Sequence, residues 1–389
     1  MDRSKWEYKK LKDVCVSIDD GDWIESQDQS SEGIRLIQTG NIGIGEYLDK
    51  SDKAKYISED TFERLKCKEI FCGDCLISRL PDPIGRACIL PDMSDRMITA
   101  VDCSIVRFKD IIVPDFFVHY TKSRNYNSDI NKHATGATRK RISRKNLEGV
   151  MIPAPPVADQ QRIVAELDCL NEMIALKQEQ LKEFNKLALA IFHDMFGDSV
   201  INSKGWPTDK IENVISEKSY RGTINNEDGQ VWLLNLDMVE SNTGRILEKL
   251  FVSTEKTDGS VTTFNEEYVL YSKLRPYLNK VVLPDSSGYC TTELVTLLPN
   301  KDKLNRYYVA YLLRSESFVN YICGKVAGAK MPRVSMKEFR IFSIPLPPLA
   351  LQQQFAEKIQ AIEAQKELVK KSIAETQHLL DSRMDLYFD

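Results

Sequence analysis

The pattern Arg141-Ile-Ser-Arg-Lys-Asn-Leu147, Ile152-Pro-Ala-Pro-Pro156, Gln160-Gln161 and a helical segment closing on Phe196 occurs twice in this chain. The second copy reads Arg333-Val-Ser-Met-Lys-Glu-Phe339, Ile344-Pro-Leu-Pro-Pro348, Gln352-Gln353, and it closes on Phe388. The offset is 192 residues throughout, and no gap is needed. A repeat of this length indicates two copies of one structural unit.

The repeat extends outward to the start of each half. Trp6 and the segment Leu11–Val14 open the first half, and Trp206 and Ile211–Val214 open the second. The sequence therefore predicts an α/β (α+β) globular domain at 1–150, a helix at 151–199, a second domain at 200–342 and a C-terminal helix at 343–389. The arrangement has an internal pseudo-twofold repeat.

Short apolar runs between Gly, Pro and Asp residues predict the strands of each domain. In the first half these are Ile34–Ile37, Cys75–Ser78, Ala87–Leu90 and Cys103–Phe108, and a helix is expected near Asp115–Lys122. In the second half they are Val231–Leu234, Tyr268–Tyr271, Lys280–Leu283 and Leu294–Leu298, and a helix is expected near Tyr307–Ser315. Similarity between the halves is weak from Trp23 to Lys66 and strong in the second part of each half. This predicts that each domain has a constant part, which we call its rear, and a variable part, which we call its front.

Both long helices carry apolar residues at coiled-coil spacing. The expected seam comprises Ile163, Leu167, Leu170, Ile174, Leu181, Phe184, Ile191, Phe355, Ile359, Ile362, Val369, Ile373 and Leu380. Asp159 is a candidate N-cap for the first helix. Two seams of the same phase favour pairing of the helices with each other, and the alternative is that each helix packs on its own domain.

Composition and charge are those of an ordinary globular protein. The 389 residues are 42% apolar and 28% charged, with a net charge of −4, so a nucleic-acid site would require local positive charge. The nine cysteines are odd in number and lack a framework spacing, which favours reduced thiols. The sequence contains no apolar run of membrane-spanning length and no signal-peptide pattern, so we expect a cytoplasmic protein.

Catalytic motifs are missing from the sequence. It has no phosphate-binding glycine loop, no paired zinc motif and no His-Glu-x-x-His helix. Cys67, Cys72 and Cys75 lack a second pair at metal-binding spacing, which favours incidental thiols. Asp92 and Asp102 faintly resemble a nuclease core, but Ser104 occupies the position where such a nuclease needs lysine. We therefore expect no catalytic residues and no metal.

Local positive charge lies inside the repeat. The segment Ile130–Leu147 contains no acidic residue, and neither does Phe318–Lys337. Each contains a Gly-Ala pair whose backbone amides could approach an anion closely. Recurrence in an acidic protein favours phosphate binding over a solvated surface. The candidate phosphate-binding residues are Lys132, Arg139, Lys140, Arg141, Arg144, Lys145, Lys325, Lys330, Arg333 and Lys337.

The doubled set of Gly-Ala, Arg-x-Ser, Pro-x-Pro-Pro-x-Ala-x-Gln-Gln and a long helix resembles the specificity subunit of type I restriction-modification enzymes. The resemblance covers essentially the whole chain. It implies two target-recognition domains on an antiparallel coiled coil, each reading one half of a bipartite double-stranded DNA target. It also implies two docked methyltransferase subunits and a restriction (translocase) subunit. S-adenosylmethionine, ATP and Mg are implied only for those partners, and this chain needs no cofactor.

The variable fronts are expected to read bases, because base edges require target-specific side chains. The candidates are Gln38, Thr39, Asn41, Arg79, Arg86, Asn235, Asp237, Lys273 and Arg275. Two other classes of function remain open. A stand-alone DNA-binding regulator would not need helices for partner docking, and a coiled-coil scaffold would leave the paired basic segments without a purpose.

Overall fold

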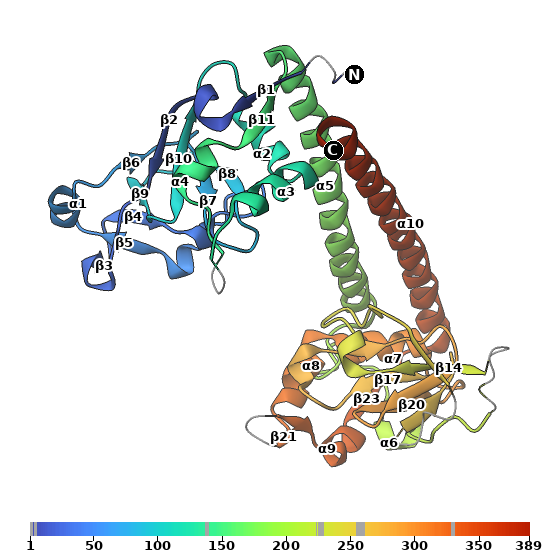
Figure 1. Ribbon diagram of the computed structural model, residues 1–389. Coiled ribbons are helices and arrows are strands. Elements are labelled where there is room, and N and C mark those ends of the chain that lie inside the picture. Colours follow the sequence, from blue (N-terminus) through green and yellow to red (C-terminus); the bar gives the residue numbers. More distant parts are fainter. Residues whose placement is uncertain are drawn as a thin grey trace. The chain divides into compact units, whose positions relative to one another are not determined.

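The chain forms two compact units. The computed structural model describes residue 3 and residues 6–136, 140–222, 224, 229–253, 261–327 and 331–389. Unit 1 comprises Met1–Leu176 and Ile373–Asp389, and unit 2 comprises Lys177–Ser372. Each unit therefore contains one globular half together with one end of each long helix (Figure 1).

Unit 1 contains a rear antiparallel sheet with the strand order β2-β10-β7-β8. Its strands are β2 (Cys15–Asp20), β10 (Cys103–Phe108), β7 (Cys75–Ser78) and β8 (Ala87–Ile89). The helices α2 (Pro114–Tyr120) and α3 (Arg124–His133) contribute to the same apolar core as this sheet, which confirms the helix expected near residue 115. Three of the four strands expected in the first half are rear strands.

A second, five-stranded sheet forms the front of unit 1, with the order β3-β5-β4-β9-β6. Its strands are β3 (Gln29–Ser30), β4 (Ile34–Ile37), β5 (Lys55–Ile57), β6 (Glu69–Ile70) and β9 (Met97–Thr99). Strands β4 and β9 are parallel, and the other pairs are antiparallel. The helix α1 (Glu59–Leu65) connects β5 to β6, and its N-cap is Ser58. Buried residues from both sheets form a separate front core.

Unit 2 repeats both sheets. Its rear sheet has the order β13-β20-β17-β18, and its front sheet has the order β15-β14-β19-β16. The rear strands are β13 (Ile215–Ser216), β20 (Leu294–Pro299), β17 (Val269–Ser272) and β18 (Val281–Val282). The front strands are β14 (Gln230–Leu234), β15 (Leu250–Ser253), β16 (Val261–Phe264) and β19 (Gly288–Thr291). The parallel pair β14 and β19 matches β4 and β9, so four strands of the front keep their order where the sequence repeat is weak, and β3 has no counterpart among the described residues of unit 2.

The remaining elements complete the internal repeat. The short pair β1 (Glu7–Lys10) and β11 (Met151–Ala154) corresponds to β12 (Thr208–Lys210) and β23 (Ser343–Pro345). The other helices of the two units are α4 (Arg144–Glu148), α6 (Ile211–Val214), α7 (Arg306–Arg314), α8 (Glu316–Cys323) and α9 (Met336–Ile341). Strands β21 (Val326–Ala327) and β22 (Arg333–Val334) pair as a small ribbon. The expected helix near residue 307 is thus confirmed as α7.

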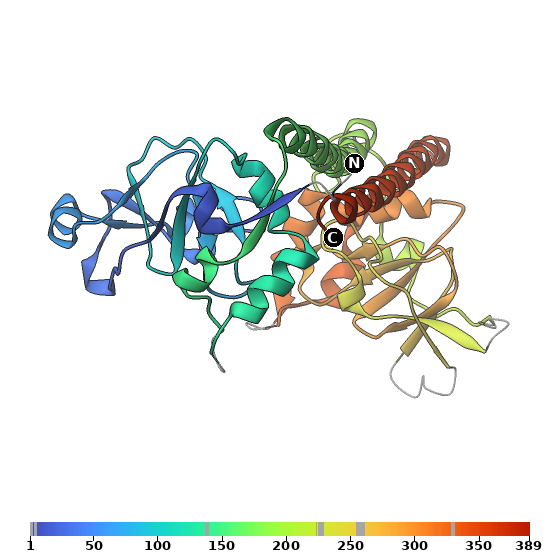
Figure 2. The same cartoon turned by 45° about the horizontal axis from the view of Figure 1, so that its top comes forward.

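The two long helices are α5 (Val157–Phe196) and α10 (Leu349–Phe388), and they run alongside each other in both views (Figures 1 and 2). In unit 1, Glu166 of α5 forms an ion pair with Arg383 at 2.7 Å. In unit 2, the Lys177 ammonium donates to the Ser372 carbonyl at 3.4 Å, and the Phe192 and Phe355 rings lie 5.6 Å apart. Residue numbers rise on one helix as they fall on the other, so the pairing is antiparallel.

The expected seam faces inward along both helices. Ile163, Leu167, Leu170 and Ile174 are buried in the core of unit 1 together with Leu380, and Ile373 packs against them. Phe355, Ile359 and Ile362 are buried in the core of unit 2, where Phe184 and Ile191 pack. Leu181 and Val369 are half-buried. The N-cap prediction was wrong, because α5 already begins at Val157 and Asp159 lies in its first turn.

A buried glutamine fastens each long helix to its globular half, which explains the Pro-Pro-x-x-x-Gln motif. The Gln160 amide donates to the carbonyls of Ile111 and Pro155, each at 2.8 Å, and accepts from the Val113 N–H at 2.8 Å. In unit 2 the Gln352 amide donates to Lys303 and Pro347 and accepts from the Asn305 N–H. Two carbonyl acceptors and one N–H donor require a side chain that both donates and accepts, as glutamine does. Because all three partners are backbone groups, the side chains of the partner residues can vary.

All nine cysteines fall within the described residues, and each is a free thiol. Burial raises the pKa of the Cys67 thiol to about 11 and that of the Cys103 thiol to about 12. These thiols therefore stay protonated at neutral pH. Among the described helices, none combines the length and the apolar character that crossing a membrane requires.

Candidate nucleic-acid interface

The basic segment of unit 1 forms a loop between α3 and α4. Its base is a pair of backbone hydrogen bonds in which Thr135 and Arg141 each donate to the other's carbonyl at 2.8 Å. Gly136 has a positive φ of 108°, a conformation that favours glycine. Arg139 and Ala137 lie outside the described residues, so the prediction for Arg139 is not placed in the structure.

Unit 2 builds the corresponding loop from the ribbon β21–β22. Ala327 pairs with Arg333 and Val326 pairs with Val334. Lys330 lies outside the described residues, as does the Gly328-Ala329 pair. Together with the loop of unit 1, this gives one basic loop per unit: residues 135–141 and residues 327–333. Both loops occupy the same place in the repeated architecture.

Each basic loop is anchored to the rear sheet by the same set of contacts. Arg141 forms an ion pair with Asp102 at 3.0 Å, and Arg333 forms one with Glu293 at 2.9 Å. Asp102 and Glu293 stand directly before the rear strands β10 and β20. The Arg333 guanidinium, which hydrogen-bonds to Glu293, lowers the pKa of that carboxyl. Arg141 and Arg333 therefore fix the base of each loop and leave about half of their side chains exposed.

The two loops share backbone contacts as well. In unit 1, the Arg79 N–H donates to the Asp102 carbonyl at 2.9 Å and the Arg79 carbonyl accepts from Ile142 at 3.2 Å. In unit 2, the Lys273 N–H donates to the Glu293 carbonyl at 3.1 Å and the Lys273 carbonyl accepts from Val334 at 2.8 Å. The chain then turns into α4 or α9, whose N-caps are Ser143 and Ser335. The Arg-x-Ser motif thus combines a loop anchor with a helix cap.

The other candidate cations fall into two groups. Arg144 contacts Glu148 at 3.3 Å and Asp20 at 3.8 Å, and Lys325 contacts Glu338 at 3.5 Å. Within the described ranges, no ion-pair partner is present for the exposed side chains of Lys132, Lys140, Lys145 and Lys337. Three of these four candidates belong to unit 1, and one, Lys337, belongs to unit 2.

Three residues predicted to read bases make contacts within the fold. The Arg79 guanidinium is buried, donates to the Val101 carbonyl and lies 3.4 Å from Asp20. Arg86 donates to backbone carbonyls, including those of Ile42 at 2.7 Å and Thr39 at 2.9 Å. The Asn41 amide bridges the Gln38 N–H and the Leu48 carbonyl. These contacts engage Arg86, Asn41 and the Nη2 group of Arg79, whose Nε has no partner among the described residues. A role of the three residues in base readout stays a prediction.

The other base-readout candidates lie at equivalent turns in the two fronts. Gln38 and Thr39 enter a 3₁₀ turn after β4, and Asn235 and Asp237 do the same after β14. Asp237 is exposed and Asn235 is half-buried. The two stretches are therefore structurally equivalent. The Lys280 ammonium donates to the Leu236 carbonyl at 2.8 Å, as the Arg86 guanidinium donates to the Thr39 carbonyl at 2.9 Å.

Lys273 and Arg275 lie beside the basic loop of unit 2. Lys273 is half-buried, and Arg275 is exposed with a positive φ of 50°. The Arg275 N–H donates to the Pro332 carbonyl at 2.8 Å, which places Arg275 next to the loop. Residues that the sequence did not single out, such as Trp23, Gln29 and Lys55, line a groove on the front of unit 1. They follow no periodic pattern, so no sequence signal marks them.

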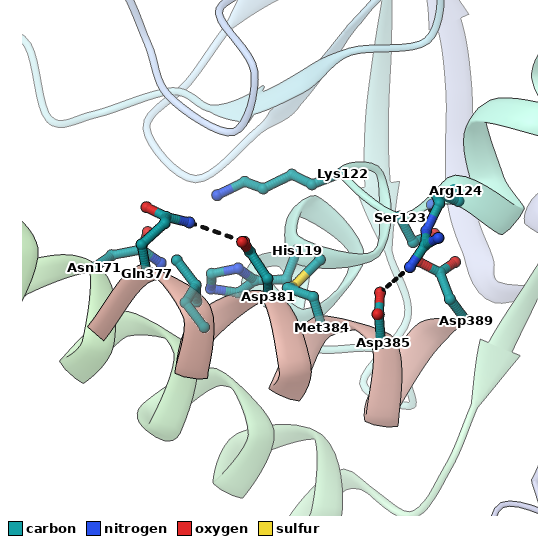
Figure 3. Close-up of a pocket in the computed structure, with 11 residues that line it drawn as sticks. His119, Lys122, Ser123, Arg124, Asn171, Gln377, Asp381, Met384, Asp385 and Asp389 are labelled. Atoms are coloured by element: carbon teal, nitrogen blue, oxygen red, sulfur yellow. Dashed lines mark hydrogen bonds and ion pairs between the residues drawn. The ribbon is translucent and has the colours of Figure 1, made fainter. Parts of the chain in front are cut away.

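A separate pocket of about 450 Å³ lies in unit 1 where α2 and α3 meet the end of α10 (Figure 3). Arg124 forms an ion pair with Asp385 at 2.5 Å, and His119 contacts Asp168 of α5 at 2.7 Å. Burial, followed by the charge of Lys122, lowers the pKa of His119 despite that carboxylate. These contacts connect the globular half of unit 1 to α5 and α10.

Comparisons with known proteins agree with this architecture. The sequence model described as "Type I restriction modification DNA specificity domain" matches residues 3–186 and 221–378. A Methanocaldococcus jannaschii chain named the MjaX specificity subunit of a type I restriction enzyme is 22% identical, over 94% of this chain and 88% of its own length.

Two solved structures share the fold. One comes from work on complex assembly and conformational transition of the type I R-M system, with a TM-score of 0.60, 18% identity and coverage of 98% of this chain and 96% of the other. The other is the S subunit of a type I restriction-modification system from M. genitalium, with a TM-score of 0.56, 12% identity and coverage of 99% and 96%. Since the family match spans both halves of the repeat, the chain belongs to the type I restriction-modification DNA specificity family.

Proposed function

We propose that this chain is the non-catalytic subunit that selects the DNA sequence for a type I restriction-modification complex. Each unit would bind one half of a bipartite double-stranded target. The observation that carries the proposal is the pair of basic loops, held by equivalent ion pairs at Arg141 and Arg333 in two copies of one fold. A stand-alone regulator or a scaffold accounts less well for this doubled loop beside two long helices.

The basic loops are suited to the sugar-phosphate backbone. Phosphate contacts fix the position of a protein on duplex DNA and carry no sequence information. A common role of this kind fits elements that the two units share. Lys140 and Lys145 supply free charge beside the loop of unit 1, and Lys337 does so beside the loop of unit 2. Base readout, which must differ between half-sites, is assigned to the fronts, where the sequence repeat is weak.

The paired helices are assigned to spacing and partner docking. Unit 1 exposes Leu176 at 63% and Leu379 at 44%, and unit 2 exposes Leu368 at 61% and Leu187 at 47%. These are equivalent pairs under the 192-residue offset. We assign these recurring leucines to contacts with a protein partner, because they are exposed at the same positions of the repeat in both units. Equivalent surfaces in both units fit two copies of one partner, which we assign to two methyltransferase subunits.

The chemistry would be supplied by those partners. S-adenosylmethionine is assigned to the methyltransferase subunits, and ATP and Mg are assigned to a restriction (translocase) subunit that joins the assembly. No cofactor is assigned to this chain, and the proposed location of the complex is the cytoplasm. Co-expressing the chain with its methyltransferase and sequencing the methylated bases should reveal a bipartite motif. Methylation by the isolated chain, or a motif independent of this chain, would contradict the proposal.

Binding measurements test the assignment of the loops. Replacing Arg139, Lys140, Arg141 and Arg144 by Ala should weaken binding to specific and nonspecific duplexes alike. The slope of log K against log salt should flatten by about 0.9 for each phosphate that the variant no longer neutralises. The matched control replaces Lys182 and Lys186, which pair with Glu179 and Glu183 on α5. An unchanged salt slope in the loop variant would show that these residues do not contact phosphates and form only a solvated surface.

A further inference from the structure

A shallow groove on the front of unit 1 gathers side chains that are suited to base edges. Its volume is about 650 Å³, and its lining includes Trp23, Glu25, Gln27, Gln29, Gln38 and Lys55. The Trp23 ring is 68% exposed. Three carboxamides, an indole and an ammonium group thus line one surface, and Glu25 is the acidic residue among them.

The hydrogen bonds within the groove differ among the three carboxamides. Glu25 accepts from the Trp23 indole N–H at 3.3 Å and from one N–H of the Gln27 amide at 2.9 Å. The Gln38 side chain caps the turn Thr39–Asn41. In the part of the chain that the structure describes, the Gln29 amide and the Lys55 ammonium have no hydrogen-bond or ion-pair partner. Among the three carboxamides, Gln27 and Gln38 each make one hydrogen bond within the described structure, whereas Gln29 has both its amide N–H groups and its oxygen available for a bidentate contact.

The edge strand that carries Gln29 distinguishes unit 1 from the described part of unit 2. Gln29 lies on β3, at one edge of the front sheet. The sheet order β5-β4-β9-β6 recurs in unit 2 as β15-β14-β19-β16, but the described residues of unit 2 contain no counterpart of β3. All six groove residues fall between Trp23 and Lys66, the segment where the two halves are least alike. A feature that differs between the units is what discrimination between two different half-sites requires.

Charge separates the ligand of the groove from that of the basic loop. The Glu25 carboxylate disfavours a phosphate inside the groove itself, because like charges repel. A base edge is thus the better ligand for the groove, with the phosphate backbone left to the loop.

We propose that Gln29 reads an adenine of the half-site bound by unit 1, through the major-groove edge of that base. The inference rests on the proposed function. A glutamine amide donates to adenine N7 and accepts from the adenine N6 amino group, a bidentate pattern that other base pairs do not offer. Lys55 flanks this contact on β5, and the exposed Trp23 ring offers an apolar surface for the thymine methyl group of the same base pair.

The test uses the full chain in complex with its methyltransferase, and the readout is the methylated motif by sequencing. The variant Gln29→Ala should lose about tenfold or more of its discrimination at one A·T pair of one half-site. The variant Gln29→Glu should shift the preference there toward C·G, because a carboxylate accepts from the cytosine N4 amino group. The other half-site should stay unchanged.

The matched control is Gln161→Glu, the same chemical change at an exposed position on α5 outside the groove. It should leave both half-sites unchanged. A parental motif retained with equal strictness in both Gln29 variants would overturn the inference and leave the proposed function standing. A change at a G·C pair would also overturn the adenine assignment. A parent complex without any sequence-specific methylation would remove the proposed function, and the inference with it.

Discussion

Replacing Gln160 tests whether one buried side chain fastens α5 to the first globular half. Gln160 is fully buried, and its amide satisfies three backbone groups: the carbonyls of Ile111 and Pro155 and the N–H of Val113. The variant Gln160→Ala leaves all three groups without their side-chain partner. We therefore expect unit 1 to be destabilised more than a surface substitution would destabilise it.

The magnitude follows from the number of unpaired groups. A buried backbone group left without a partner costs about 1–3 kcal/mol, and partial relaxation favours the lower end of that range. Three such groups give a loss of about 3–5 kcal/mol in the free energy of unfolding of unit 1. For a unit of this size, about 2–4 °C of Tm is lost per kcal/mol, so the transition of unit 1 should fall by roughly 6–20 °C.

The variant Gln160→Glu adds a pH dependence with a defined sign. The carboxylate faces two carbonyl oxygens in a buried site, so its pKa in the folded state should lie above the unfolded value of about 4.3. The folded state then binds more protons than the unfolded state, and stability should fall as pH rises above about 4.3. The slope is about 1.4 kcal/mol per pH unit until the pH reaches the folded-state pKa.

The assay is denaturant-induced and thermal unfolding of the full chain, and the adjacent Gln161 provides the control. Gln161 is exposed on the same turn of α5, so Gln161→Ala and Gln161→Glu should change stability by less than about 0.5 kcal/mol. Gln352→Ala should reproduce the effect in unit 2. Equal unfolding midpoints for Gln160→Ala and Gln161→Ala would refute the reasoning.

Three further predictions address modularity, spacing and pH. Exchanging residues 200–341 for those of another family member should change one half of the methylated motif, and changes in both halves would show that the domains do not read independently. Inserting four residues within Lys177–Lys182 lengthens α5 by roughly 6 Å. The number of unread base pairs between the two half-sites should then grow by one or two, while both half-site sequences stay unchanged. An active variant that keeps the parental number of unread base pairs would exclude the helices as the spacer. Burial and Lys122 hold the pKa of His119 below its usual range. As the pH falls below about 6.5, the unfolded state therefore binds a proton before the folded state does, and unit 1 should lose stability. The variant His119→Gln should reduce that loss, and an unaltered pH profile of unfolding would contradict the assignment.

The architecture could be predicted from the sequence because its signals are local. Apolar runs bounded by turn residues marked the rear strands Cys75–Ser78 and Cys103–Phe108, in which the residues from Cys75 to Ser78 and from Cys103 to Val106 are buried. The seam of the long helices followed from heptad spacing, since positions three and four apart share one helix face. The gap-free offset of 192 residues between 141–196 and 333–388 indicated two copies of one unit without any knowledge of contacts.

Only the tertiary structure decided what the charged residues do. Arg141 stands in a segment without an acidic residue, yet it pairs with Asp102, which is distant in sequence and is brought close by the start of β10. Arg79 has the sequence pattern of an exposed strand-end cation, but the turn of the chain buries it against Val101 and Asp20. The partners of a charged side chain depend on which segments meet, and spacing along the chain does not contain that information.

The groove of unit 1 shows the same limit. Trp23, Gln29 and Lys55 lie on separate segments that are joined when β3 and β5 pair at the edge of the front sheet. The sequence marked this region through its weak similarity to the second half. The hydrogen bonds that fold the region decided which side chains are already engaged: Gln27 and Gln38 each make one, and the Gln29 side chain makes none among the described residues.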